Sequence, residues 1–283
     1  MRLDERLMAY PVPVGEQEMS PRDAMLYGLG IGIGSDPLDK GQLRFVYEKE
    51  LEVFPSMAVV LAGPGFWVKD PATGVDWVKV LHGEMGMTLH RPIPTEGKLV
   101  GHTRIVDVID KGENRGALIL QERIVTDATG EKICTLTSTT FARGNGGFGG
   151  PAKQAPVPHV LPERDPDGFV ELPTLDQAAL IYRLSGDYNP LHADPDIATA
   201  AGFDRPILHG LCTFGVACHG LVKAVLNYDA SRLREMNLRF SAPVYPGETI
   251  RVDYWQDDDI VSFRALVVER DVTVLNNGRA IVR

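Results

Sequence analysis

The sequence predicts an α+β fold built from two similar halves, because two landmarks recur at nearly the same spacing. Asp-Pro-Leu at 36–38 corresponds to Asn-Pro-Leu at 189–191, 153 positions later. Pro-Ile-Pro at 92–94 corresponds to Pro-Val-Tyr-Pro at 243–246, 151 positions later. Helix-like sequence precedes the first landmark in each half, and alternating sequence follows the second. An internal duplication explains this order. Chance similarity is the alternative, since a helix before a meander is common.

Each predicted helix has start and stop signals. Ser20 and Asp23 have the spacing of a capping box, in which two side chains satisfy free backbone N–H groups at a helix start. Thr174 and Gln177 have the same spacing in the second half, and Gly186 provides a stop. We therefore expect a capped helix near the start of each half.

Three segments in each half alternate apolar and polar residues, which is typical of half-buried strands separated by turns. They are 98–108, 117–126 and 132–143 in the first half and 249–256, 260–270 and 272–282 in the second. Between the halves, the sequence is rich in glycine and proline and lacks periodicity. We expect a first domain at 1–145, a linker at 146–168 and a second domain at 169–283.

Composition indicates a folded protein with a substantial core. The 283 residues are 44% hydrophobic and 24% charged, which excludes a chain that is disordered throughout. Lys and Arg total 29 against 38 Asp and Glu, a net charge of −9, so non-specific binding of nucleic acid is not expected. A local basic patch for an anionic ligand is compatible with this charge.

The cysteines and the chain ends bear on location. The three cysteines, Cys134, Cys212 and Cys218, do not form the pattern of a disulfide framework, so a reducing compartment is expected. The charged start, MRLDERLMAY, lacks the apolar region of a secretory signal, and the final AIVR is not a peroxisomal address. No apolar run approaches the roughly 20 residues that cross a bilayer. We expect a cytoplasmic protein without a membrane span.

The second half holds the densest cluster of polar residues in apolar surroundings, since residues 182–192 read YRLSGDYNPLH. Asp187 and His192 are five positions apart, and Pro190 restricts the backbone between them. A carboxylate and an imidazole on one short loop can hold a water molecule and exchange protons with it, and Asn189 can orient either group. A simple turn is the alternative, because the segment is rich in turn formers and the aspartate can cap the next helix.

The repeat contains this pair only once. Gly34 stands opposite Asp187 in the first half, and Asp39 stands opposite His192. A pair that the fold alone required should occur in both copies. The difference therefore indicates one active site, in the second half.

A buried helix of small residues is predicted after Pro206, and Gly210 lies near its start. Free N–H groups at a helix start favour negative charge, and a glycine lets a ligand approach the backbone closely. The oxygen of a thioester that becomes enolate-like fits such a position, as in an oxyanion hole. The alternative is that Gly210 only permits tight packing of the helix.

A metal or cofactor site is the weaker interpretation of the remaining polar residues. Asp187, His192, His209 and His219 carry suitable ligand atoms, but a zinc-type spacing such as His-Glu-x-x-His does not occur. The glycines at 28–34 end a predicted helix instead of following a strand, which is not the pattern of a dinucleotide site. We expect neither a metal nor a cofactor.

Taken together, these motifs resemble those of a known enzyme family. Residues 182–192, with AGF at 201–203 and PILHGLCTFG at 206–215, closely resemble the signature of MaoC-like hydratases. These are the R-specific 2-enoyl-CoA hydratases, or hydratase 2, and the resemblance extends to the hydratase part of the peroxisomal multifunctional enzyme type 2. Further counterparts, which extend the resemblance over nearly the whole chain, are at 27–30, 47–48, 80–84, 146–150 and 243–247.

The resemblance implies a double hot-dog fold, in which each half is a curved antiparallel sheet wrapped around a long central helix. It implies hydration of trans-2-enoyl-CoA to (3R)-3-hydroxyacyl-CoA. By this resemblance, Asp187 and His192 hold the catalytic water, Asn189 supports them, and the N–H of Gly210 binds the thioester oxygen. Asp187 then takes a proton from the water and His192 delivers one to C2. The family's glutamate in its Tyr-Glu pair affects activity, which implies a role for Glu48.

The resemblance also bears on substrate binding and assembly. Tyr188 and Met85 stand where the family commonly has a tryptophan and a glutamine, and we expect both departures to affect substrate selection rather than the chemistry. We expect Glu48, Tyr188, His209 and Glu84 to contact the substrate and the first half to make room for bulky acyl chains. The expected partners are an acyl-CoA thioester and a second copy of the chain in a homodimer.

Two other classes of function stay open. A hot-dog thioesterase would release free coenzyme A, and a non-catalytic acyl-CoA-binding subunit would bind without turnover. The intact Asp187 and His192 pair argues against the second. Within the hydratase class, the runner-up substrate is a branched, dicarboxylic or steroid side-chain acyl-CoA.

Overall fold

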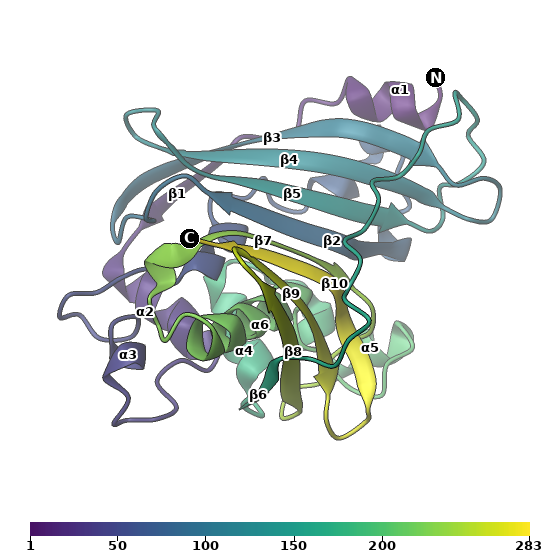
Figure 1. Cartoon of the computed structure of the whole chain (residues 1–283). Helices are drawn as coiled ribbons and strands as arrows, with labels where there is room; N and C mark the ends of the chain where they lie inside the picture. The colour runs from purple at the N-terminus through teal and green to yellow at the C-terminus, as the bar shows by residue number, and fades with distance from the viewer.

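A single antiparallel sheet of ten strands forms the centre of the computed structural model, which describes residues 1–283 (Figure 1). The spatial order is β1-β3-β4-β5-β2-β7-β10-β9-β8-β6, so the second half repeats the order of the first in reverse. The strands of the first half are β1 (Gly15–Met19), β2 (Val80–Leu89), β3 (Gly97–Asp110), β4 (Ala117–Asp127) and β5 (Lys132–Ala142). Those of the second are β6 (Gly168–Pro173), β7 (Leu233–Phe240), β8 (Thr249–Asp257), β9 (Ile260–Val267) and β10 (Val272–Val282).

The six predicted strand segments are all strands, and the repeat is visible as five equivalent strands in each half. The antiparallel sheet expected in each half is present, but the two sheets are joined into one. β2 pairs with β5 on one side and with β7 on the other, so the halves share one sheet. An unpaired edge at β2 would leave backbone N–H and C=O groups without partners, and pairing with β7 satisfies them.

The helices lie mainly on one side of this sheet (Figure 1). The α-helices are α1 (Leu3–Met8), α2 (Pro21–Gly30), α3 (Lys40–Leu43), α4 (Ala178–Tyr182), α5 (Pro195–Ala200) and α6 (Gly210–Ala224). The short 3-10 helices are η1 (Pro55–Val60), η2 (Trp67–Lys69), η3 (Pro71–Thr73), η4 (Trp77–Lys79), η5 (Arg183–Ser185), η6 (Pro190–His192) and η7 (Ala230–Arg232). No helix combines the length and the apolar character needed to cross a membrane.

The central helix differs between the halves. In the second half, α6 is 15 residues long and is buried from Cys212 to Val222. Its small residues allow this, since a Cβ on Gly215 would lie only 2.6 Å from the side chain of Ile31. At the equivalent place in the chain order, the first half has only the six residues of η1, which pack on α6 and β2. The expectation of a long central helix in each half is therefore wrong for the first half.

One of the two predicted caps is confirmed. Ser20 accepts a hydrogen bond from Asp23 N at 3.4 Å, and the Asp23 carboxylate accepts one from Ser20 N at 2.9 Å. The Thr174 cap is wrong, because its hydroxyl donates to the carbonyl of Glu248 at 2.8 Å and α4 begins only after Gln177. Pairing of β6 with β8 brings Thr174 to the turn before β8, where this contact competes with the cap.

Residues 144–167 connect the halves without helix or strand and run along one side of the sheet to β6 (Figure 1). The connection is attached where it passes the second half. The amide of Asn277 donates to the carbonyl of His159 at 2.8 Å, and the His159 ring lies 2.8 Å from the Ser262 hydroxyl. These contacts hold the connection against β9 and β10.

Candidate active site

A cavity of about 840 Å³ has residues of both halves in its wall. Its apolar wall includes Met57 and Val59 from η1 and Leu211 from α6. Asp187 enters from the polar loop of the second half, and Arg123 enters from β4 of the first. Because η1 is much shorter than α6, the first half leaves room here that the second half fills with helix.

The polar loop turns sharply after α4. Gly186 has a φ of +116°, which lies in the left-handed region that favours glycine. Asp187 Oδ1 then accepts from Asn189 N at 3.2 Å, and Asn189 Oδ1 accepts from Leu191 N at 3.2 Å, which starts η6. The turn interpretation and the site interpretation therefore both apply. Asn189 shapes the loop through its side chain while the loop carries Asp187 and His192.

His192 is buried, and its Nδ1 lies 2.8 Å from the carbonyl oxygen of Ile207. A carbonyl only accepts, so Nδ1 carries the proton and Nε2 keeps a lone pair. Burial lowers the pKa of His192, while the Ile207 carbonyl and Asp187 oppose that shift. The ring is therefore neutral near pH 7 and its Nε2 is a proton acceptor.

His209 lies beneath the loop, with its ring stacked on that of His192 at a centroid distance of 3.8 Å. Its Nε2 donates to the backbone carbonyl of Asp187 at 3.1 Å. Burial, followed by the neighbouring His192, lowers the pKa of His209 to about 4. His209 was predicted to contact substrate, but it is 1% exposed, so in this geometry it holds the loop in place.

Gly210 is the first residue of α6, and His209 occupies the N-cap. The N–H groups of Cys212 and Thr213 return to the His209 carbonyl, whereas those of Gly210 and Leu211 have no acceptor in the protein. Leu211 lines the cavity, and a Cβ on Gly210 would lie 3.3 Å from the Phe240 ring. Two free donors thus lie next to the stacked histidines, where the sequence predicted an oxyanion site.

The other predicted contact residues are dispersed. Tyr188 lines the cavity at its exposed rim, with the Arg183 guanidinium 5.1 Å from its ring centroid. Glu48 is exposed, forms no hydrogen bond or ion pair, and is not in the cavity wall. The structure therefore brings Tyr188 to the site but not Glu48.

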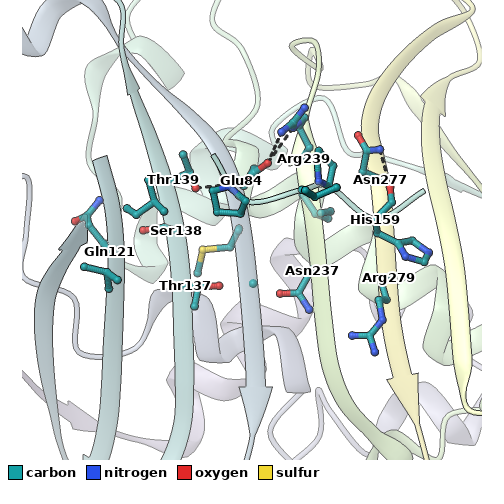
Figure 2. Close-up of a pocket in the computed structure, with 18 residues that line it drawn as sticks. Glu84, Gln121, Thr137, Ser138, Thr139, His159, Asn237, Arg239, Asn277 and Arg279 are labelled. Atoms are coloured by element: carbon teal, nitrogen blue, oxygen red, sulfur yellow. Dashed lines mark hydrogen bonds and ion pairs between the residues drawn. The ribbon is translucent and has the colours of Figure 1, made fainter. Parts of the chain in front are cut away.

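Glu84 lies on the opposite face of the sheet (Figure 2). Its carboxylate accepts from Arg239 Nε at 3.0 Å and from the Thr139 hydroxyl at 3.1 Å, in the wall of a second cavity of about 550 Å³. A bulge at Gly83 causes this, because the register shifts between His82 and Glu84. The bulge directs His82 into the larger cavity and Glu84 away from it.

The cavity also contains His82 and Arg123, which were not predicted as site residues. His82 lines it beside the Phe240 ring. Arg123 shares its face of β4 with Ile119 and Val125, which are buried and apolar. The charged residue at an inward position of β4 was the available signal.

The structure also tests the weaker metal interpretation. Single ligand atoms of Asp187, His192 and His209 lie within 4.8 Å of one another, whereas His219 bonds the Tyr228 hydroxyl at 3.0 Å within the core. One nitrogen of His192 and one of His209 are engaged with carbonyls, and the remaining His209 nitrogen is enclosed. This set offers fewer free donors than a tetrahedral zinc site needs.

Comparison with known proteins places this geometry in a family. The family model described as MFE-2 hydratase 2 N-terminal domain matches residues 18–144, and the one described as MaoC like domain matches 159–278. Enoyl-CoA hydratase ChsH3 of Mycobacterium tuberculosis is 39% identical over 99% of this chain and 98% of its own length. The chain belongs to the MaoC-like hydratase 2 family.

Other members agree. Peroxisomal enoyl-CoA hydratase 2 of Arabidopsis thaliana is 36% identical over 95% of this chain and 92% of its own length. A MaoC-like dehydratase from Phytophthora capsici superimposes with a TM-score of 0.86 at 34% identity, covering 99% of this chain and 98% of that one. A Mycobacterium tuberculosis protein described as having a double hotdog fold aligns over 100% of this chain and 98% of its own, with a TM-score of 0.59 at 14% identity, which concerns the fold alone. The double hot-dog fold predicted for this hydratase 2 family member is confirmed.

Proposed function

We propose that this chain is an R-specific enoyl-CoA hydratase that adds water to trans-2-enoyl-CoA and gives (3R)-3-hydroxyacyl-CoA, reversibly, in fatty-acid or related acyl-CoA metabolism. The observation that carries the proposal is the grouping of Asp187 and His192 beside two free N–H groups at the start of α6. Membership of the hydratase 2 family supports the same reaction.

The thioester oxygen binds at the helix start. A carbonyl oxygen that accepts from Gly210 N–H gains negative charge as water adds to C3, and the free donors stabilise that charge. Leu211 N–H is the second available donor. This contact polarises the double bond and fixes which face of the substrate meets the polar loop.

The protonation state of His192 favours one of two proton routes. In the route predicted from the sequence, Asp187 takes the water proton and His192 supplies another, which requires a proton on His192 Nε2 at the outset. The bond from His192 Nδ1 to Ile207 leaves Nε2 with a lone pair instead. We therefore assign the water proton to Nε2 as the hydroxyl attacks C3, and the resulting imidazolium returns it to C2. The Asp187 carboxylate holds the water and stabilises the imidazolium.

The test is hydration of trans-2-enoyl-CoAs of graded chain length by the purified protein, with chiral analysis of the product. We expect the 3R product, and its absence for every straight-chain, branched and bulky substrate would refute the proposal. Release of free thiol in the same assay would indicate the thioesterase instead. Binding without turnover would indicate the acyl-CoA-binding subunit.

Location and assembly are separate proposals. We propose a cytoplasmic homodimer, in keeping with the three unpaired, buried cysteines. Several relatives carry peroxisomal in their names, so a tagged chain in its own cell would decide the location. Light scattering of the purified protein would decide the oligomeric state.

A further inference from the structure

Arg123 is a cation in the cavity wall that has no carboxylate partner. One guanidinium nitrogen, Nη2, donates to the backbone carbonyl of Val59 at 2.7 Å, and Nε has no partner at all. Burial lowers the pKa of Arg123 to about 10. A partly buried charge without a counter-charge is unfavourable, so an anion from outside the chain would stabilise this site.

The carboxylates that share the cavity are engaged elsewhere. Glu16 pairs with Lys98 at 2.9 Å, and Asp23 belongs to the cap of α2. Asp187 accepts from the loop backbone. By contrast, the partly buried Arg239 on the other face of the sheet has its own carboxylate, Glu84. Of these two arginines, Arg123 is the one without a carboxylate partner.

The chain is built to leave space around the guanidinium. A Cβ on Gly63 would lie 2.7 Å from Arg123 Nη1. The bend that carries Gly63 includes Ala62, which has a left-handed φ of +44°. Its carbonyl oxygen fits against Gly15 and Gly101, where a Cβ on either glycine would overlap it. The facing glycines of β1 and β3 thus position the bend that frames Arg123.

Arg123 shares its cavity with the loop that carries Asp187. Asp187 and His82 line that cavity together with Arg123. The phosphates of coenzyme A lie at the far end of the pantetheine arm from the thioester. An anion that meets Arg123 while C3 meets Asp187 therefore belongs to the acyl chain and not to the coenzyme.

We infer that Arg123 binds a carboxylate carried by the acyl chain, so that the substrate class is an enoyl-CoA with a second, anionic end. The inference rests on the proposed hydratase function. Apolar walls at Met57 and Val59 receive the methylene groups, and the guanidinium receives the terminal oxygen atoms.

The test compares enoyl-CoA substrates in pairs of equal carbon number, one ending in a methyl group and one in a carboxylate. We expect Arg123→Met to lower kcat/KM for the preferred carboxylate-ended substrate by roughly 10- to 100-fold, mainly through KM, which is the loss expected for a charge-assisted contact. The methyl-ended partner should keep its wild-type kcat/KM. Arg123→Lys keeps the charge and should retain part of the preference. Arg104→Met is the matched control, since that exposed arginine pairs with Glu122 outside the cavity.

Calorimetry with the corresponding saturated acyl-CoAs, one methyl-ended and one carboxylate-ended, measures binding without turnover. Thermal melting reports whether loss of the hydrogen bond from Arg123 to Val59 affects folding. Should Arg123→Met not fold, Arg123→Lys against wild type carries the comparison. Equal effects on both members of each pair, or on neither, would overturn the inference while hydration itself continues. If the wild-type protein hydrated no substrate and still bound the carboxylate-ended thioester through Arg123, the proposed hydratase function would be overturned and the inference about Arg123 would stand.

Discussion

The two halves of this chain share a strand frame but differ in what the frame encloses. The second half has the long helix α6, whose free N–H groups meet a loop with an aspartate and a histidine. The first half has the six-residue η1 and, in the space beside it, an unpaired arginine. The comparison teaches that, when one half of a duplicated fold has a shorter central helix, that half can form part of the cavity wall while the other half carries the reacting groups.

The largest expected effect concerns the pair that occurs in one half only. Asp187→Asn and His192→Gln should each lower kcat by at least about 10²-fold, because the first removes the charge that holds the water and stabilises the imidazolium and the second removes the group that carries the proton. The first half offers a control in Asp39, which caps α3 by accepting from Gly41 N at 2.9 Å. Asp39→Asn should leave kcat unchanged. Steady-state rates decide this, and wild-type turnover in either second-half variant would remove the assignment.

Acid stability should depend on the enclosed histidines of the second half. Burial lowers the pKa of His219 to about 4, so its unfolded form gains a proton as pH falls below its ordinary value of 6.5 while the folded form does not. Because His219 is buried in its neutral form, it stabilises the fold most above pH 6.5. The free energy of unfolding should fall by roughly 3 kcal/mol as the pH falls from 6.5 to 4. Denaturant unfolding across this window should show a smaller loss in His219→Gln.

The exposed His102 provides the matched control for this measurement. His102→Gln should keep the wild-type dependence of unfolding free energy on pH. If His219→Gln and His102→Gln gave the same curve, enclosure of His219 would not be the cause of the acid sensitivity.

A glycine in each half's helix should respond to alanine in opposite directions. A Cβ on Gly215 in α6 would meet Ile31 at 2.6 Å, so Gly215→Ala should lower the free energy of unfolding by about 1–3 kcal/mol. A Cβ on Gly30 in α2 would make ordinary contacts at 3.7 Å, so Gly30→Ala should raise it by up to about 1 kcal/mol through helix propensity. Denaturant unfolding measures both, and a shift of the same sign in both would contradict the packing argument.

The smallest effect is expected where the two halves meet. Glu84 links β2 to β7 through Arg239 on the face away from the cavity. Glu84→Gln should leave kcat unchanged and lower the free energy of unfolding by at most about 1 kcal/mol, as is typical of partly exposed ion pairs. A large fall in kcat with unchanged stability would mean that Glu84 acts in the reaction, as its resemblance to the family suggested.

Much of the fold was predictable because strands and turns have local signals. All six alternating segments became strands, and Ser20 with Asp23 became a cap. The Thr174 cap failed because a partner distant in sequence, the Glu248 carbonyl, competes for its hydroxyl. The loop with Asp187 and His192 was predictable for a related reason, since a short segment with Gly186 and Pro190 brings both groups together by itself.

The sequence alone thus determined the duplication, the strands, the acid–base loop and the helix start at Gly210, which all depend on neighbours within a few positions. Only the tertiary structure decided that the sheets join at β2 and β7, that Glu84 faces away from the site, and that Arg123 lacks a carboxylate partner. The physical reason is that side-chain direction beyond a bulge and the pairing of enclosed charges depend on groups far apart in the chain. Their free energies are settled only when the whole fold is in place.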